Sequence, residues 1–168
     1  MTTLDVALGR DKLLAWRLDP LLYTSTWDSG EGAYRFGGRW NSVGVRAVYC
    51  SLEAATCILE LAVHKGFAPL DRTPHTLSAL EVTQRSHVHV VDAGELPNPN
   101  WLYATRPSAG QQEFGDALLR KYQFLAVPSV VSRHSWNLVF VASRAQGAYQ
   151  LNGQERFALD TRLHPPQT

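Results

Sequence analysis

The chain has 168 residues, of which 45% are hydrophobic and 18% charged, so it is long enough for one buried core and does not have a disordered composition. Sixteen Lys and Arg residues against fifteen Asp and Glu give a net charge of +1, which leaves no excess of basic side chains for binding nucleic acid. Charged residues interrupt the N-terminal apolar run, so we expect neither a signal peptide nor a membrane span, and the two cysteines, Cys50 and Cys57, predict reduced thiols in the cytoplasm.

A turn-rich stretch over residues 27–44 precedes a short apolar run, residues 47–50, which is typical of a buried strand. We expect Ser51 to cap a helix over residues 52–65 that ends at Gly66. Spacings of three and four place the apolar residues of this helix on one stripe and its polar residues on a neighbouring face. The expected buried stripe is Leu52, Ala55, Leu59 and Ala62, and the polar face is Glu53, Cys57, Glu60 and His64.

The second half of the chain contains more strand-like segments and one further helix. The helix is expected over residues 111–121, with Phe114 and Leu118 one turn apart. Helices do not alternate strictly with strands, which favours an α+β fold over a doubly wound parallel sheet. No repeat divides the sequence, so we expect a single domain over residues 1–168. The later strands are expected over residues 76–82, 87–91, 124–127, 138–142 and 156–159.

Three common kinds of site are disfavoured by the spacing of their residues. Gly30-Glu31-Gly32 begins like a dinucleotide-binding fingerprint, but Arg35 stands where the third glycine belongs, and we expect no strand before it and no helix after it. Cys50, Cys57 and His64 are seven residues apart, unlike the closely spaced ligands of structural zinc sites, so we expect no metal. No G-x-S-x-G elbow for a serine hydrolase is present.

Residues 34–44 combine three glycines, two arginines, three aromatic rings, an asparagine and a serine. Glycines let the backbone approach a ligand closely, and an arginine offers a forked donor to a phosphate. Taken alone, this composition fits a phosphate-binding loop and an ordinary glycine-rich turn equally well. Glu60 taken alone fits a solvent-facing carboxylate paired with His64 better than a catalytic group.

Several segments, in order along nearly the whole chain, resemble the RES domain, a family named for an Arg, a Glu and a Ser. The matching segments are Trp-Arg-Leu at 16–18, Gly-Gly-Arg-Trp-Asn-Ser-Val-Gly at 37–44, Val-Tyr-Cys-Ser at 48–51, Leu-Glu at 59–60 with His64, Phe-Gly-Asp at 114–116, Val-Pro-Ser at 127–129 and Phe-Ala-Leu-Asp-Thr-Arg-Leu at 157–163. One element departs from the family. Where relatives carry N-P-x-H-P after an Asn-rich strand, this chain keeps Asn137 but has Val-Ala-Ser-Arg-Ala at 141–145.

The resemblance implies an ADP-ribosyltransferase-like fold with a split, bent β-core and flanking helices. It also implies the toxin of a bacterial type II toxin–antitoxin system that cleaves the nicotinamide–ribose bond of NAD, by hydrolysis or phosphorolysis, and so depletes cellular NAD and arrests growth. NAD would be a substrate and not a permanently bound cofactor. The alternatives are a mono-ADP-ribosyltransferase that modifies a cellular protein and a non-catalytic module that binds a nucleotide or the antitoxin.

The partner that the resemblance implies is an Xre-like antitoxin with a helix-turn-helix part, whose C-terminal region blocks the toxin cleft. The toxin itself would contact neither nucleic acid nor membrane. A homodimer within a larger toxin–antitoxin complex is also compatible with the resemblance.

The resemblance also assigns roles to four catalytic residues. Glu60 would stabilise the positive charge that develops on the ribose, Arg39 would bind the pyrophosphate, and Tyr49 would stack on nicotinamide. Ser129 would bond the nicotinamide ribose or position Glu60. The residues expected to bind NAD are Arg17, Arg39, Trp40, Asn41, Tyr49 and Asn137, with Arg17 as the second pyrophosphate ligand and Trp40 as a second wall beside the nicotinamide.

Overall fold

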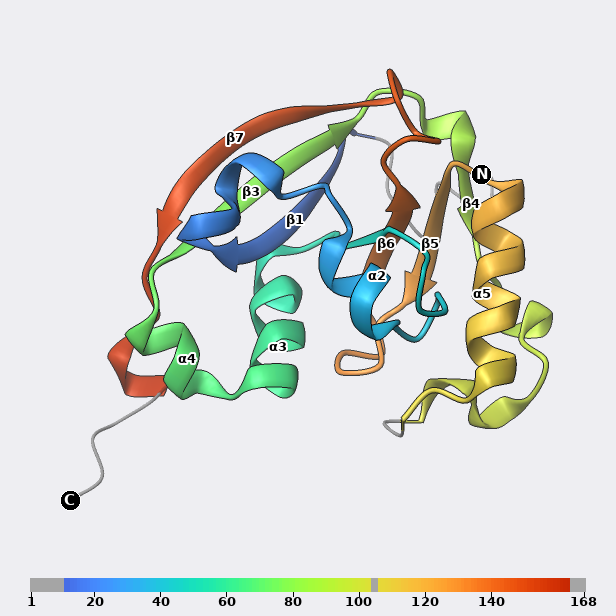
Figure 1. Ribbon diagram of the computed structural model, residues 1–168, viewed down its shortest axis with the longest axis horizontal. Coiled ribbons are helices and arrows are strands. Elements are labelled where there is room, and N and C mark those ends of the chain that lie inside the picture. The colour runs from blue at the N-terminus through green and yellow to red at the C-terminus, as the bar shows by residue number, and fades with distance from the viewer. Residues whose placement is uncertain (1–10, 104–105, 164–168) are drawn as a thin grey trace.

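The computed structural model describes residues 11–103 and 106–163 and contains one seven-stranded mixed sheet flanked by helices (Figure 1). The strand order is β4-β5-β6-β2-β1-β3-β7. The strands are β1 (Leu13–Pro20), β2 (Ala47–Ser51), β3 (His75–Val82), β4 (Val88–Val90), β5 (Phe124–Pro128), β6 (Trp136–Val141) and β7 (Tyr149–Phe157). The α-helices are α2 (Glu31–Phe36), α3 (Ala54–Lys65), α4 (Phe67–Arg72) and α5 (Ala109–Lys121). Short 3-10 helices are η1 (Leu21–Thr26), η2 (Arg85–His87), η3 (Ala93–Glu95), η4 (Pro99–Leu102) and η5 (Thr161–Leu163).

The sheet consists of two blocks that meet at a narrow junction. In one block β1, β3 and β7 pair antiparallel along nearly their whole length, and they bow together across the molecule in Figure 1. In the other, β2, β6 and β5 pair antiparallel and β4 adds a parallel edge. The register between β1 and β2 consists of the single pair Trp16 and Ser51. This arrangement confirms the predicted α+β class with a split, bent β-core.

Both faces of the sheet are covered at β5, as its continuous apolar run shows. Side chains alternate between the two faces of a strand. Phe124 and Ala126 therefore enter one core cluster, whereas Leu125 and Val127 enter another that also contains Leu119 of α5. A third cluster lies beneath α3 and α4 and consists of Leu18, Cys57, Ala62, Leu70, Leu77 and Leu159.

The helix that carries Glu60 begins and packs differently from the prediction. It starts at Ala54 after Glu53, and Ser51 is the last residue of β2 and not a cap. Gly66 ends the helix with a φ of 77°, as predicted. In the expected stripe Ala62 is buried and Leu52, which precedes the helix, is partly buried against the core. Ala55 and Leu59 are exposed, because the side of α3 that contains Cys57 faces β1 and β3.

Two further elements differ from the expectation. The last strand, β7, spans Tyr149–Phe157 instead of 156–159, and its residues 150–156 are exposed, so hydropathy gave no sign of it. Helix α2 begins directly after Gly30, where we expected no helix. The dinucleotide-binding fingerprint stays excluded because the 3-10 helix η1, and not a strand, precedes that glycine.

The two thiols make a prediction about stability at alkaline pH. Burial raises the pKa of Cys50 and of Cys57, the latter from 9.0 to about 12. Between these values the folded chain keeps a proton that the unfolded chain loses, so the free energy of unfolding falls as the pH rises above 9, by up to about 1.4 kcal/mol per pH unit for each thiol. Urea unfolding at pH 8 to 10.5 measures the free energy of unfolding, which should fall less steeply with pH for Cys57→Ala than for the wild type. An equal dependence on pH would contradict the raised pKa of Cys57.

Candidate functional site

Two side chains meet at one carboxylate oxygen of Glu60, from which they are distant in the sequence. The Ser129 hydroxyl donates to Oε1 of Glu60 at 2.8 Å, and the Asn137 amide donates to the same oxygen at 2.6 Å. Ser129 is only 2% exposed. Both donors are neutral and both bond Oε1, so among the described residues Oε2 lies outside this network and can accept a further hydrogen bond.

The strand register explains why these residues meet. Asn137 of β6 pairs with Ser51 of β2 on one side and with Val127 of β5 on the other, and Ser129 follows the end of β5. The Ser51 hydroxyl donates to Oδ1 of Asn137 at 2.7 Å, which turns the Asn137 amide group toward Glu60. Sequence reasoning missed this role of Ser51 because a serine before a helix is also typical of an N-cap.

The direction of the Ser129 bond follows from its surroundings. The Ser132 N–H donates to Ser129 Oγ at 3.1 Å, which leaves the Ser129 proton for Glu60. The loop between β5 and β6 is closed further by hydrogen bonds from Ser129 N–H to the Ser135 carbonyl and between the hydroxyls of Ser132 and Ser135. The loop that supplies the donor is therefore held by its own hydrogen bonds.

Arg39 lies within electrostatic range of Glu60. Its guanidinium donates to the carbonyl oxygen of Trp101 at 3.1 Å. Partial burial lowers the pKa of Arg39, and the Glu60 carboxylate opposes that shift. An arginine stays protonated nonetheless, so a fixed positive charge lies near the Glu60 carboxylate.

Tyr49 and Asn41 hold the loop that carries Arg39. The Tyr49 hydroxyl donates to Oδ1 of Asn41 at 2.7 Å and accepts from the Trp40 N–H at 3.0 Å. Burial raises the pKa of Tyr49, so its hydroxyl stays protonated. The Tyr49 ring is half-buried, and its contact with nicotinamide stays a prediction. Its hydroxyl is hydrogen-bonded to Asn41 and Trp40 of the loop.

Three residues predicted to contact NAD have side chains that bond or pack within the protein. The Asn41 side chain is fully buried, and its amide donates to three backbone carbonyls. Trp40 is 3% exposed and packs against Trp101, so it offers no free ring face. The Arg17 guanidinium donates to the Tyr49 carbonyl at 2.9 Å and to Asp19 at 2.8 Å. In the structure these three side chains therefore support the site from within, and their contact with NAD stays a prediction.

The ion pair between the partly buried Arg17 and the buried Asp19 lies at the junction of β1 and β2. Burial raises the pKa of Asp19, and the neighbouring Arg17 lowers it. Because Arg17 belongs to β1 and the Tyr49 carbonyl to β2, this guanidinium joins the two strands where their own pairing is short. This is a structural reason for an arginine at position 17.

Helix α5 supports residues 37–46, here called the Arg39 loop, which connect α2 to β2. The Asp116 carboxylate accepts from the Ser42 N–H at 3.0 Å, and the Gln112 amide donates to the Gly38 carbonyl at 3.0 Å. Gly115 lies against the Trp40 backbone so closely that an added Cβ would be 2.2 Å from its carbonyl oxygen. The loop is thus fixed between α5 and β2.

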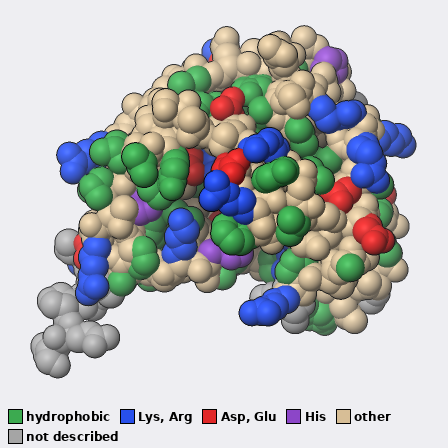
Figure 2. Space-filling model, viewed as in Figure 1, with side chains coloured by type: hydrophobic (Ala, Val, Ile, Leu, Met, Phe, Trp, Pro, Cys, Tyr) green, Lys and Arg blue, Asp and Glu red, His purple; other side chains and the backbone are tan. Residues whose placement is uncertain are grey.

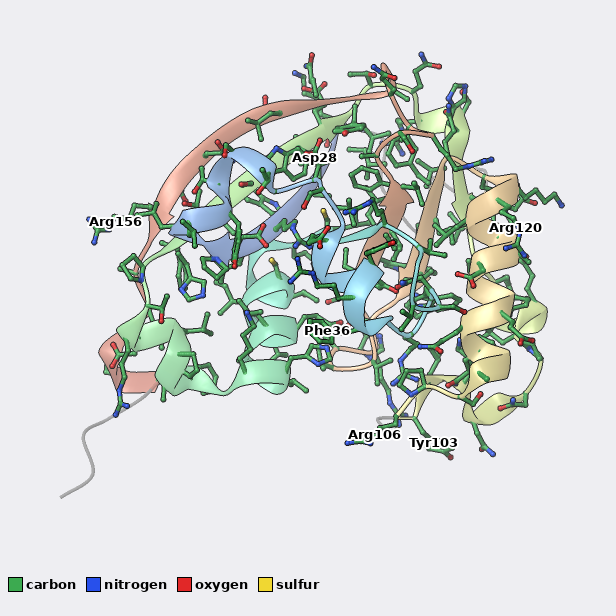
Figure 3. All side chains as sticks on the ribbon, in the orientation of Figure 1. Asp28, Phe36, Tyr103, Arg106, Arg120 and Arg156 are labelled. Atoms are coloured by element: carbon green, nitrogen blue, oxygen red, sulfur yellow. The ribbon has the colours of Figure 1, made fainter. Side chains whose placement is uncertain are left out.

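A cavity of about 330 Å³ adjoins the Glu60 network because it shares Ser129 with it. Its walls include Leu102 and Pro128, and its rim includes Tyr103 and Arg133, both exposed. Sequence reasoning missed these two rim residues, because neither lies in a segment with the pattern of a known site. Figure 3 places Tyr103 at the lower edge of the molecule.

Neither a metal site nor a membrane-spanning helix is found among residues 11–103 and 106–163. No three His, Cys, Asp or Glu side chains in these ranges are placed to hold a metal ion together. None of the helices described there is long and apolar enough to cross a bilayer. Basic and acidic side chains are intermixed over the face shown in Figure 2.

Comparison with known proteins gives matches along most of the chain. Residues 14–160 match the RES domain. A protein named Toxin Res, from Photorhabdus laumondii subsp. laumondii, is 28% identical over 155 residues, which are 90% of this chain and 97% of that protein. A protein named Prs ADP-ribosylating toxin, from Sphingobium sp., is 35% identical over 134 residues, which are 74% of this chain and 79% of that protein.

A solved structure has the same architecture. It is the crystal structure of the M. tuberculosis MbcT–MbcA toxin–antitoxin complex, which matches with a TM-score of 0.70 and 23% identity over 88% of this chain and 85% of the matched chain. At this identity the match establishes the fold, which is the one expected from the sequence.

Proposed function

Because the chain belongs to the RES domain family, we propose that it is a toxin that cleaves the nicotinamide–ribose bond of NAD. The observation that carries this proposal is the Glu60 carboxylate, which receives two neutral donors on one oxygen and keeps the other for a ligand. A carboxylate fixed in this way suits a reaction whose transition state carries positive charge on a sugar.

In the proposed reaction the bond between C1′ of the ribose and the nicotinamide nitrogen breaks. The bonding electron pair leaves with nicotinamide, which becomes neutral, and the ribose develops oxocarbenium character that Oε2 of Glu60 stabilises. An oxygen of water or phosphate then bonds C1′ and releases its proton to the solvent. Arg39 provides positive charge for the pyrophosphate, and Ser129 and Asn137 fix the carboxylate.

Ser129→Ala tests the positioning of Glu60. This change removes one of the two donors, so we expect kcat to fall about 10- to 100-fold, with a KM for NAD close to that of the wild type. The control is Ser132→Ala, which removes a hydroxyl from the same loop but keeps the N–H that bonds Ser129. Initial rates of nicotinamide release measure both variants, and equal rates for Ser129→Ala and the wild type would contradict the proposed role.

A second candidate function is the transfer of ADP-ribose to a protein. The observation in its favour is the name of the 35% identical Sphingobium relative, an ADP-ribosylating toxin. The bond that breaks is the same in both reactions, and only the nucleophile that attacks C1′ differs. The Glu60 network would serve either reaction.

The deciding experiment mixes the purified chain with NAD, with and without phosphate, and follows NAD, nicotinamide and the ribosyl product by chromatography. Release of nicotinamide supports the proposal, and ADP-ribose or ADP-ribose 1-phosphate identifies the nucleophile as water or phosphate. If NAD is consumed only when cell extract is added and label appears on a protein, the second function holds. NAD that stays intact under both conditions contradicts both.

We also propose an antitoxin as the partner, because the matched solved structure is a toxin–antitoxin complex. The finer expectation of an Xre-like antitoxin rests on the family resemblance. Such a partner would cover the site that contains Glu60 and Arg39. Purification with the neighbouring gene product, followed by the same NAD assay, measures this inhibition.

A further inference from the structure

The cavity beside Ser129 has two rim residues with no part in the Glu60 network. Arg133 is exposed and has no hydrogen-bond or salt-bridge partner among the residues that the structure describes. Tyr103 is 56% exposed, so a face of its ring is available to a ligand. The two enter the rim from separate segments, Arg133 from the loop between β5 and β6 and Tyr103 from the end of η4.

Both segments are fixed by the same groups that build the site. The β5–β6 loop is held by Ser129, which also bonds Glu60. Tyr103 follows Trp101, which is 1% exposed and whose carbonyl accepts from Arg39 and from Gln111. The rim residues therefore lie at set positions relative to Glu60 and Arg39.

The chemistry of the rim matches one half of a dinucleotide. A guanidinium without an internal partner binds a phosphate through its fork of N–H donors, and an exposed aromatic ring stacks on a planar base. Leu102 and Pro128 add apolar wall beside the ring. If Glu60 contacts the nicotinamide ribose, the adjoining cavity is the space next to it in which the rest of the ligand can lie.

We propose that Arg133 and Tyr103 form a subsite for the adenosine-phosphate half of the substrate, with the guanidinium on the phosphate and the ring against adenine. This inference rests on the proposed function and adds to it the residues that select a dinucleotide over a mononucleotide. The subsite supplies binding and takes no part in bond cleavage.

Binding of ADP-ribose, which is not turned over, tests the subsite without catalysis. Calorimetry should show affinity about 10-fold weaker for Arg133→Gln, from the loss of a charged hydrogen bond, and about 5- to 10-fold weaker for Tyr103→Ala, from the loss of stacking. Tyr103→Phe keeps the ring and should bind like the wild type. Arg156→Gln is the matched control, because Arg156 is an exposed arginine on the opposite side of the molecule in Figure 3.

Kinetics with a truncated substrate locate the effect. Nicotinamide mononucleotide has the same scissile bond as NAD but lacks the adenosine-phosphate half. Arg133→Gln should raise the KM for NAD about 10-fold with kcat little changed, and should leave the KM for the mononucleotide as it is. Equal effects on both substrates would overturn the proposed location.

The subsite and the proposed function fail in different ways. If the wild type binds ADP-ribose or cleaves NAD and neither rim variant weakens binding, the subsite is wrong and the proposed function stands. If the wild type neither binds ADP-ribose nor consumes NAD, both are wrong. Weaker binding by both rim variants, with Arg156→Gln unchanged, supports the subsite.

Discussion

Glu60→Gln is expected to lower the rate of nicotinamide release about 1,000-fold, the largest effect on activity that we predict from one substitution. Glutamine has the shape of glutamate, and its carbonyl oxygen still accepts from Ser129 and Asn137. The change removes the negative charge that would stabilise the ribose cation and replaces the acceptor Oε2 by an NH2 group. Binding of ADP-ribose and the melting temperature should therefore stay close to those of the wild type.

The matched control is Glu113→Gln, which removes a carboxylate from an exposed position on α5. It should release nicotinamide at the wild-type rate. A Glu60→Gln variant that turns over NAD normally would remove Glu60 from the reaction. A variant that loses activity and also melts at a lower temperature would show that the change damages the fold, and Glu60→Asp would then separate charge from geometry.

Gly115→Ala is expected to cost the fold about 3 kcal/mol, at the upper end for overpacking. An added Cβ would lie 2.2 Å from the carbonyl oxygen of Trp40 and 2.5 Å from its carbonyl carbon. Both atoms are backbone, so no side-chain rotation relieves the contact. Helix α5 would have to move away from the Arg39 loop, which would break the bond between Asp116 and Ser42.

Urea unfolding measures this loss, and the same helix provides its control. Gly110 also lies in α5, but an added Cβ there meets nothing closer than the Ser108 hydroxyl at 4.0 Å. Gly110→Ala should therefore be neutral or stabilise the protein by up to about 1 kcal/mol through helix propensity. Equal losses for the two variants would show that the cost comes from the helix backbone and not from the contact with Trp40.

The elements that could be predicted from the sequence are those whose burial is uniform. The apolar run of β5 is buried on both faces, so its hydropathy was sufficient. The edge strand β7 is held by backbone pairing with β3 while its side chains face solvent, so its polar sequence gave no signal. In α3 the sheet covers Cys57 and leaves Leu59 exposed, which only the tertiary arrangement decides.

The sequence predicted which residues gather at the candidate site better than it predicted what each of them does. The family resemblance named Glu60, Ser129 and Asn137, and the structure brings these three together. It did not distinguish residues that face a ligand from those that support the loop. Trp40 and Asn41 support the loop in the structure, because a loop with many glycines needs internal hydrogen bonds and packing to keep one conformation, and their contact with NAD stays a prediction. Ser51 depends on strand register, which no local pattern reveals.

The narrow junction of the sheet has a mechanical consequence. Helix α3 packs on the block of β1 and β3, whereas both partners of Glu60, Ser129 and Asn137, belong to the block of β5 and β6. The hydrogen bonds of the Glu60 carboxylate thus connect the two blocks of the sheet across their junction. Ser51 lies at this junction, paired with Trp16 of β1 on one side and with Asn137 of β6 on the other. A change in the relative orientation of the two blocks would therefore alter the hydrogen bonds from Ser129 and Asn137 to Glu60.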